Sequence, residues 1–426
     1  MFSRLNQKHN LLTDLLFFLL FLVLPFQFGK HFWPFFAYVS GIRVDYLSPT
    51  IYLSDVLVVL LIMVTGVKKR LTFSKKFLTI FLTTILYLAI TIFFSQSPMN
   101  GWYDLVKLIE YVLFGWIIAA SCKNVTPLLF ITFFIDVFLE STLAILQIVH
   151  QGALQGFWYF LGERAFSAAT PGIANASING QLVLRPYATF SHPNVFAGYL
   201  VVALLFFLVF LFTTKKIWQR ILTGVVLLFG MSILLLTLSR VAIGVFFFLA
   251  VVYSFSKIKK VLPRLFLFGG MLLFALLTGG RLLIGRFTDV QGYVTSFFLR
   301  DILMQVAWQM FALHPLFGIG LGNFLVLLPH FLPKTILFSF LQPVHNIFLF
   351  VLAETGIVGL LLFVLLCFFA LRQSWKQRQN PLSLFSFLSL VAILLIGMTD
   401  HYFLTLQQGQ LLLTLLLGIS MASLHS

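Results

Sequence analysis

Residues 343–370 read PVHNIFLFVLAETGIVGLLLFVLLCFFA, a short polar start followed by an apolar run over 347–370. The run is longer than the roughly 20 residues that a helix needs to cross a bilayer. His345 therefore stands where a polar loop meets an expected membrane-spanning helix. The dipole of a helix disfavours a cation at its N-terminus, so a histidine there tends to stay neutral, which is the form that a general base needs. A second interpretation stays open, in which His345 only helps to cap the helix.

The composition of the whole chain supports a membrane protein. Of the 426 residues, 60% are hydrophobic and 9% are charged, and the mean hydropathy is +1.04. These values exclude a soluble domain and indicate a polytopic membrane protein. The net charge of +16 does not indicate nucleic-acid binding, because most basic residues fall in short loops between apolar runs.

Apolar stretches follow one another along the chain, and we expect an all-α polytopic membrane protein that forms a single integral membrane domain over 1–426. It should contain about twelve transmembrane helices and a large extracytoplasmic loop with amphipathic helices. The expected spans are 11–28, 51–66, 77–95, 102–121, 126–149, 194–213, 221–238, 241–255, 264–279, 346–370, 382–399 and 405–423.

The positions of the basic residues predict the orientation. Most of the 28 Lys and Arg residues lie in short loops on one side of the expected membrane. The positive-inside rule makes this side cytoplasmic, which places both termini in the cytoplasm and the chain in the cytoplasmic (inner) membrane. We expect the first span to be retained, because no small-x-small cleavage site follows it.

Two outer segments are long enough to build a site. They are a first loop region at 151–194 and the large loop at 280–345. In the large loop, an amphipathic helical pattern should lie flat on the membrane and turn Arg300 toward the interior of the protein.

Glycines mark places where parts of the backbone are expected to approach closely. The glycine-rich stretch 318–322 is expected to form a tight turn, because it lacks the features of a dinucleotide fingerprint. Gly356 and Gly359 should allow close helix contact. Glu354 lies half a helical turn from His345, so we expect no direct proton relay between them.

Arginines dominate the basic residues expected on the outer side. Topology needs only positive charge, which lysine supplies, whereas guanidinium groups bind phosphate through paired hydrogen bonds. The excess therefore indicates an anion-binding site, although these arginines could instead pair with acidic residues of the same loops. Arg240 could also reach lipid headgroups rather than a cavity. The outer arginines are Arg43, Arg164, Arg185, Arg240, Arg281, Arg286 and Arg300.

Charged residues inside expected spans have two interpretations. Asp104, Lys107 and Glu110 follow helical spacing, and Asp136 and Glu140 are one turn apart. Buried charges must pair or face water. We favour a structural role, in which acids of its own helix or Glu140 neutralise Lys107 and join two helices. The alternative is a wet wall of an acceptor cavity, or a proton or ion path.

Several motifs occur in a fixed order between residues 185 and 365. They are RPYATFSHPN at 185–194, TLSR at 237–240, Arg300, HPLFGIGLGNF at 314–324 and HNIFLFVLAETGIVG at 345–359. In this order and spacing, the chain resembles the O-antigen ligase family. The resemblance implies an inverting, metal-independent glycosyltransferase at the outer face of the cytoplasmic membrane, with no cofactor. Its donor would be a glycan on a polyprenyl pyrophosphate, and its acceptor a hydroxyl of a glycan, lipid or protein.

The resemblance also implies roles for residues. His345 would be the base that activates the acceptor, and Arg185, Arg240 and Arg300 would bind the donor pyrophosphate. Residues considered for supporting roles are His192, Asn346, Arg281 and Arg286. The residue chemistry agrees, since fixed guanidinium groups stabilise a leaving pyrophosphate without a metal, and no Asp-x-Asp pair occurs in an outer loop.

Two other functions stay open. One is polymerisation of lipid-linked repeat units, in which donor and acceptor both carry a polyprenyl pyrophosphate. The other is transport of a lipid-linked sugar, which predicts inverted repeats with broken helices near the middle of the membrane. We detect no such repeat, and the motifs lie at the outer face.

Overall fold

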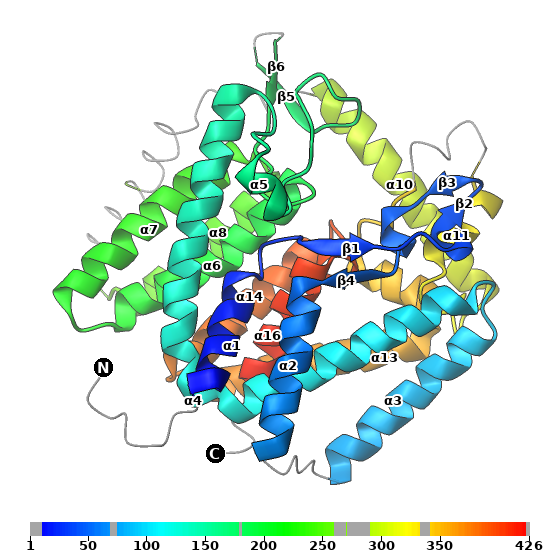
Figure 1. Ribbon diagram of the computed structural model, residues 1–426, viewed down its shortest axis with the longest axis horizontal. Helices are drawn as coiled ribbons and strands as arrows, with labels where there is room; N and C mark the ends of the chain where they lie inside the picture. The colour runs from blue at the N-terminus through cyan, green and yellow to red at the C-terminus, as the bar shows by residue number, and fades with distance from the viewer. Residues whose placement is uncertain are drawn as a thin grey trace.

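A computed structural model describes residues 11–68, 75–178, 181–259, 270, 290–332 and 341–422. Most of these residues are helical (Figure 1). The helices are α1 (Leu11–Leu22), α2 (Leu53–Lys68), α3 (Lys75–Phe93), α4 (Pro98–His150), α5 (Phe157–Phe160), α6 (Pro193–Thr213), α7 (Ile217–Leu236), α8 (Arg240–Lys257), α10 (Val290–Leu313), α11 (Phe324–Leu327), α13 (Ile347–Lys376), α14 (Pro381–Gly397), α15 (Tyr402–Thr405) and α16 (Gln407–Met421).

Membrane-spanning helices are a main feature of the described chain. By length and composition, five described helices could cross a bilayer. They are Val125–His150, Pro193–Thr213, Ile217–Leu236, Arg240–Lys257 and Ile347–Lys376. Shorter apolar helices are Leu11–Leu22, Leu53–Thr65, Leu78–Phe93 and Pro381–Gly397. The architecture is thus that of an α-helical membrane protein, and the number of twelve spans stays a prediction. The expected span 264–279 lies outside the described residues apart from Gly270.

Helix α4 replaces two of the expected spans. Its 53 residues run without interruption through 102–121 and 126–149, with Pro127 inside the helix. Figure 1 shows that the two parts run in different directions, the first toward the lower left and the second upward. Proline is a usual cause of helix bending, because it removes one backbone hydrogen bond and crowds the preceding turn. The sequence therefore predicted two apolar segments correctly but not their fusion.

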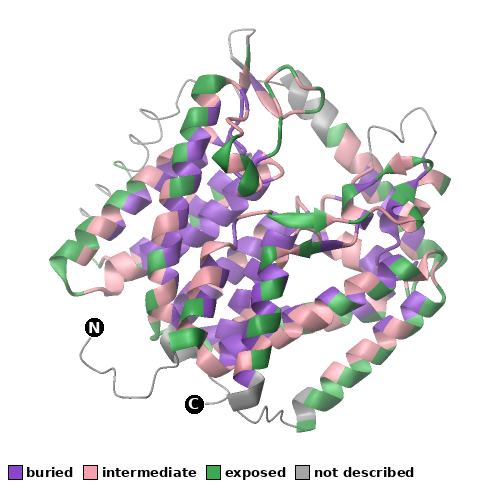
Figure 2. Cartoon of the chain, in the orientation of Figure 1, coloured by how far each residue is buried: buried purple, intermediate pink, exposed green. Residues whose placement is uncertain are grey.

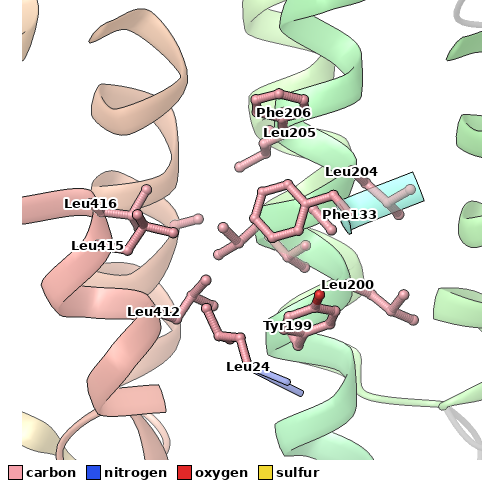
Figure 3. Close-up of a cluster of buried hydrophobic side chains, with 14 of the residues drawn as sticks. Leu24, Phe133, Tyr199, Leu200, Leu204, Leu205, Phe206, Leu412, Leu415 and Leu416 are labelled. Carbon is pink, nitrogen blue, oxygen red and sulfur yellow. The ribbon is translucent and has the colours of Figure 1, made fainter. Parts of the chain in front are cut away.

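Helix α6 lies at the centre of the molecule. Its residues are apolar on all sides, and most of them are fully buried. A helix of this kind needs protein neighbours around it, and α6 packs against α7, α8, α14 and α16. Figure 3 shows Tyr199 and Phe206 of this helix beside Phe133 of α4, on the side of α6 that faces α16. The buried position of α6 fixes its N-terminus, which begins at the motif 185–194.

Large apolar side chains lie exposed on the outer helices. On α3, Ile80, Leu86 and Phe93 have exposed fractions of 65%, 62% and 73%. Figure 2 shows the exposed positions along this helix, whereas buried residues fill the interior. Such an apolar surface suits contact with lipid chains.

The described residues also form three small antiparallel sheets, which the sequence did not predict. Each consists of two strands and lies in a connecting segment. The pairs are β1 (Gly29–His31) with β4 (Thr50–Tyr52), β2 (Tyr38–Val39) with β3 (Ile42–Arg43), and β5 (Asn175–Ile178) with β6 (Gln181–Leu184). Short 3-10 helices span Phe35–Ala37, Asp45–Leu47 and Leu328–His330.

Helix α13 is interrupted one third of the way along. Gly356 has φ 62° and ψ −168° there, a conformation that side chains other than glycine rarely adopt. The glycine turn 318–322 fits into the gap: Gly356 backs onto Leu316, where an added Cβ would lie 2.4 Å from the carbonyl oxygen. The prediction of close backbone approach is confirmed, and the partner of Gly356 is this loop rather than another helix.

Glu354 fastens the glycine turn to α13. Its buried carboxylate accepts hydrogen bonds from the amides of Gly322, at 3.1 Å, and Phe324, at 3.0 Å. The amides of Ile319 and Gly320 donate to carbonyl oxygens of α13. The glutamate therefore holds the upper part of α13 in place, and this part carries His345 at its start.

The charges within the helices pair as a structural role requires. Lys107 contacts Glu110 of its own helix at 3.0 Å and Asp55 of α2 at 2.6 Å. The own-helix prediction is confirmed for Glu110, the contact with Asp55 was not predicted, and the alternative of pairing with Glu140 is wrong. Glu140 accepts hydrogen bonds from the amide and the hydroxyl of Thr189.

The remaining acids of this group have other surroundings. Asp136 accepts a hydrogen bond of 2.8 Å from Tyr199 of α6. Asp104 lies close to the glycine turn, since a Cβ added to Gly322 would be 2.7 Å from its carboxylate. The charges of α4 therefore join it to α2, to α6, to the loop at Thr189 and to the glycine turn.

Candidate functional site

His345 and Asn346 stand at the N-terminal end of α13. Asn346 is the N-cap, and its side-chain oxygen accepts hydrogen bonds from the amides of Phe348 and Leu349. Its amide nitrogen donates to the carbonyl of Met398 at 3.1 Å. Asn346 therefore caps the helix, and His345 is not needed for that purpose. Nδ1 of His345 is buried and has no hydrogen-bond partner within the described part of the chain.

Asp400 and His401 meet His345 from the connection between α14 and α16. The rings of His345 and His401 lie 5.0 Å apart in an edge-to-face arrangement. Nδ1 of His401 is 2.6 Å from the hydroxyl of Thr405, and the carboxylate of Asp400 accepts from the amide of His401. We call His345, Asp400 and His401 the central cluster.

Arg185 reaches the central cluster through Asn194. Its guanidinium donates to the side-chain oxygen of Asn194 at 2.9 Å, and the amide nitrogen of Asn194 donates to Asp400 at 3.2 Å. Arg185 is buried and also donates to the carbonyl of Thr237 at 2.8 Å. His192 is the N-cap of α6 and accepts from the amide of Asn194. The motif 185–194 thus forms one side of the site.

Arg240 and Arg300 come from two further elements. Arg240 is the first residue of α8, three residues beyond Thr237, whose carbonyl binds Arg185. The turn before it contains Leu238 with φ 53°, a strained conformation for a branched side chain. Arg300 of α10 is half-buried and donates to the carbonyl of Thr399 at 3.2 Å. Arg300 therefore turns toward the interior, as the sequence predicted.

Burial and neighbouring charges set the protonation of the site. Burial lowers the pKa of His192 and of His401 to about 3 in each case, so both rings are neutral near pH 7. Burial also lowers the pKa of His345, and Arg300 adds to the effect while Asp400 opposes it. Burial alone would raise the pKa of Asp400, but the positive charges and imidazoles around it lower the pKa and keep it ionised. Neutral imidazoles next to one carboxylate are suited to proton transfer.

Among the described residues, the central cluster is also a group whose side chains resemble a set of metal ligands. One ligand atom from each of the three residues lies within 4.8 Å of the others. Bonds of about 2.0–2.1 Å at tetrahedral angles place zinc ligands roughly 3.4 Å apart. The guanidinium of Arg300, bound to the neighbouring Thr399, would repel a divalent ion. The three residues could therefore hold a metal ion, which the charge of Arg300 would oppose, and metal independence stays a prediction.

The sequence analysis found most of this site but missed its carboxylate. The structure brings together His345, Asn346, Arg185, His192 and Arg300. Arg281 and Arg286 lie outside the described residues. Asp400 and His401 were not predicted, although two adjacent ionisable residues between the last two apolar runs were a usable signal.

Comparison with protein-family models gives one match, to the O-antigen ligase family, over residues 225–364. The matched region contains Arg240, Arg300, the glycine turn and His345. It leaves Arg185 and Asp400 outside. The match confirms the resemblance that the motifs indicated. No curated protein matches the chain.

Proposed function

We propose that this chain, which belongs to the O-antigen ligase family through residues 225–364, transfers a glycan from a polyprenyl-pyrophosphate donor to an acceptor hydroxyl. The reaction takes place at the outer face of the inner membrane, with both chain termini in the cytoplasm. The observation that carries the proposal is the hydrogen-bonded path from Arg185 through Asn194 to Asp400, beside the ring of His345. This path connects Arg185, a candidate anion-binding group, to the surroundings of His345, the candidate base.

In the proposed reaction, the imidazole of His345 accepts the proton of the acceptor hydroxyl. The acceptor oxygen forms a bond to the anomeric carbon of the donor sugar from one side, while the bond from this carbon to the pyrophosphate breaks on the other. The electron pair of the broken bond leaves with the pyrophosphate, and the configuration inverts. Asp400 stabilises the imidazolium that forms, because its carboxylate is ionised next to the ring.

Arginines and a helix terminus would stabilise the leaving pyrophosphate. Arg185, Arg240 and Arg300 supply charge that is already in place before the reaction, which is the efficient way to stabilise a developing anion. Helix α8 adds its N-terminus at Arg240, where the side chain of the N-cap Ser239 accepts no hydrogen bond from the helix. The first amides of such a helix suit an anion.

The direct test is a reconstitution. Purified protein in liposomes would be given a polyprenyl-pyrophosphate glycan and candidate acceptors, and the glycosidic product would be measured by mass spectrometry. We expect product from the wild type and from His330→Ala, an exposed histidine of the same loop, but not from His345→Ala. Longer lipid-linked chains made from donor alone would identify a polymerase. Movement of intact donor across the bilayer with no bond formed would refute the proposal in favour of a transporter.

A further inference from the structure

The segment 29–52, which connects α1 to α2, lies beside the central cluster although no family motif covers it. Val44 and Leu47 share a buried apolar cluster with Leu303 of α10 and with Val344, the residue before the proposed base. The segment also forms two small sheets within itself, β1 with β4 and β2 with β3. The segment therefore has a defined position relative to the site.

Tyr46 makes the contact between this segment and the central cluster. Its ring is 5.6 Å from the ring of His401, in an edge-to-face arrangement. Burial raises the pKa of Tyr46, the carboxylate of Asp400 raises it further, and Arg164 acts in the opposite direction. Tyr46 is therefore a neutral hydroxyl within electrostatic range of both Asp400 and Arg164.

Arg43 is exposed but held in one orientation. Its guanidinium carbon lies 4.3 Å from the centre of the Trp33 ring. Trp33 also stacks on His31, with ring centres 5.7 Å apart and planes 12° apart, and hydroxyl groups of Ser48 and Thr50 hold Nδ1 of His31. A guanidinium stacked on an indole keeps its N–H edges free for an anion.

A second exposed arginine, Arg164, lies near this segment. A Cβ added to Gly162, two residues before it, would be 2.8 Å from the backbone nitrogen of Gln27, two residues before β1. Burial lowers the pKa of His31, and Arg43 and Arg164 add to the effect, while Asp45 opposes it. Within the described residues, neither Arg43 nor Arg164 takes part in an ion pair. Around the ring of His31, two guanidinium groups act against one carboxylate, Asp45, which gives this part of the surface a net positive charge.

We propose that Arg43, Trp33, Tyr46 and Arg164 form the acceptor subsite, and that they bind an acidic glycan. The inference rests on the proposed function. The guanidinium groups hold phosphate or carboxylate groups of the acceptor, and one of its hydroxyls then lies beside His345. Arg185 and Arg300, which are proposed to bind the glycan donor, connect to the central cluster through Asn194 and Thr399. The proposed acceptor surface contacts the cluster through His401 instead. An inverting transfer needs such separate places, because nucleophile and leaving group occupy opposite sides of the sugar carbon.

The experiment uses glycans extracted from the envelope of the cells that produce the protein. Anion exchange separates them into neutral and acidic fractions, and each fraction is offered with lipid-linked donor to the full chain in liposomes. We expect product from the acidic fraction. For Arg43→Ala and Arg164→Ala, the acceptor KM should rise roughly ten- to a hundredfold, the effect of losing a charged hydrogen bond. The donor KM and kcat should stay unchanged.

Controls separate the possible results. Lys30→Ala removes an exposed cation of β1 and should leave the acceptor KM unchanged. Arg43→Lys keeps the charge but not the stacked fork, so it should recover only part of the affinity. Phosphatase treatment that abolishes acceptor activity identifies a phosphate monoester, and amidation of carboxyl groups that abolishes it identifies a carboxylate. Equal use of the neutral fraction, or unchanged acceptor KM in both arginine variants, overturns the acceptor subsite. No product with any fraction overturns the proposed function instead.

Discussion

The replacement Asp400→Asn tests the central cluster most directly, because it removes one charge and keeps the size of the side chain. Ligand atoms of Asp400 and His345 lie within 4.8 Å of each other. Two unit charges at that distance attract by about 0.9 kcal/mol in water and about 3.5 kcal/mol at an effective dielectric constant near 20. At about 1.4 kcal/mol for each factor of ten, kcat should fall by about 4-fold to 300-fold, since the imidazolium forms only during the reaction.

The same replacement should also shift the pH dependence of the reaction in a definite direction. The carboxylate of Asp400 raises the pKa of His345 against the larger effect of burial. Its removal lowers this pKa further, so His345 stays neutral to lower pH. The acid limb of kcat/KM should therefore move to lower pH in Asp400→Asn, while the maximum rate falls. Arg300 lowers the same pKa, so Arg300→Ala should move the acid limb to higher pH.

The assay measures product formation in liposomes between about pH 4 and 9, with saturating donor and acceptor for kcat and with limiting acceptor for kcat/KM. Asp400→Glu serves as the control that keeps the charge. A fall in kcat of less than twofold for Asp400→Asn, or an acid limb that moves to higher pH, would refute the role of the carboxylate. Movement of the limb in the same direction for the Asp400 and Arg300 variants would remove the electrostatic explanation for both.

Three further predictions follow from the site and the fold. Arg300→Ala should lower kcat by about 10²–10³-fold, and Arg300→Lys by less, because fixed donors stabilise the leaving group; unchanged kcat in Arg300→Ala contradicts its assignment. Gly356→Ala should lower the thermal unfolding temperature and kcat together, because φ is 62° and the new Cβ would lie 2.4 Å from the Leu316 carbonyl oxygen. Gly224→Ala, where an added Cβ meets nothing within 4 Å, is the matched control. Activity after EDTA treatment should stay within about twofold of the untreated rate, and a loss restored by a divalent ion would show that the site needs a metal after all.

Sequence reasoning identified those parts of the fold whose signal is local. Apolar runs predicted the helices, but the N-cap of α13 is Asn346, whereas the sequence analysis had considered His345 for that role. The break in α13 was less visible, because Gly356 is only one of two glycines in an otherwise helical pattern. Its conformation depends on the loop around Leu316, which is distant in sequence.

The central cluster shows the same limit at the site. His345 was found because it starts a long apolar run, whereas Asp400 gains its importance only from contacts with Asn194 and the histidines. Those contacts join residues from α6, α13 and the segment before α16. Such contacts depend on how the helices pack, and they cannot be read from the spacing of residues within one segment.

The interruption at Gly356 also affects how the protein responds to lipid. Bilayers differ in thickness by a few ångströms, and a long apolar helix adapts to them by tilting. In α13 we expect the lower part, 357–376, to change its tilt about the glycine, while 347–355 stays fastened to the glycine turn by Glu354. Such a hinge would insulate the proposed base from variations in acyl-chain length, so that one sequence would serve membranes of different lipid composition.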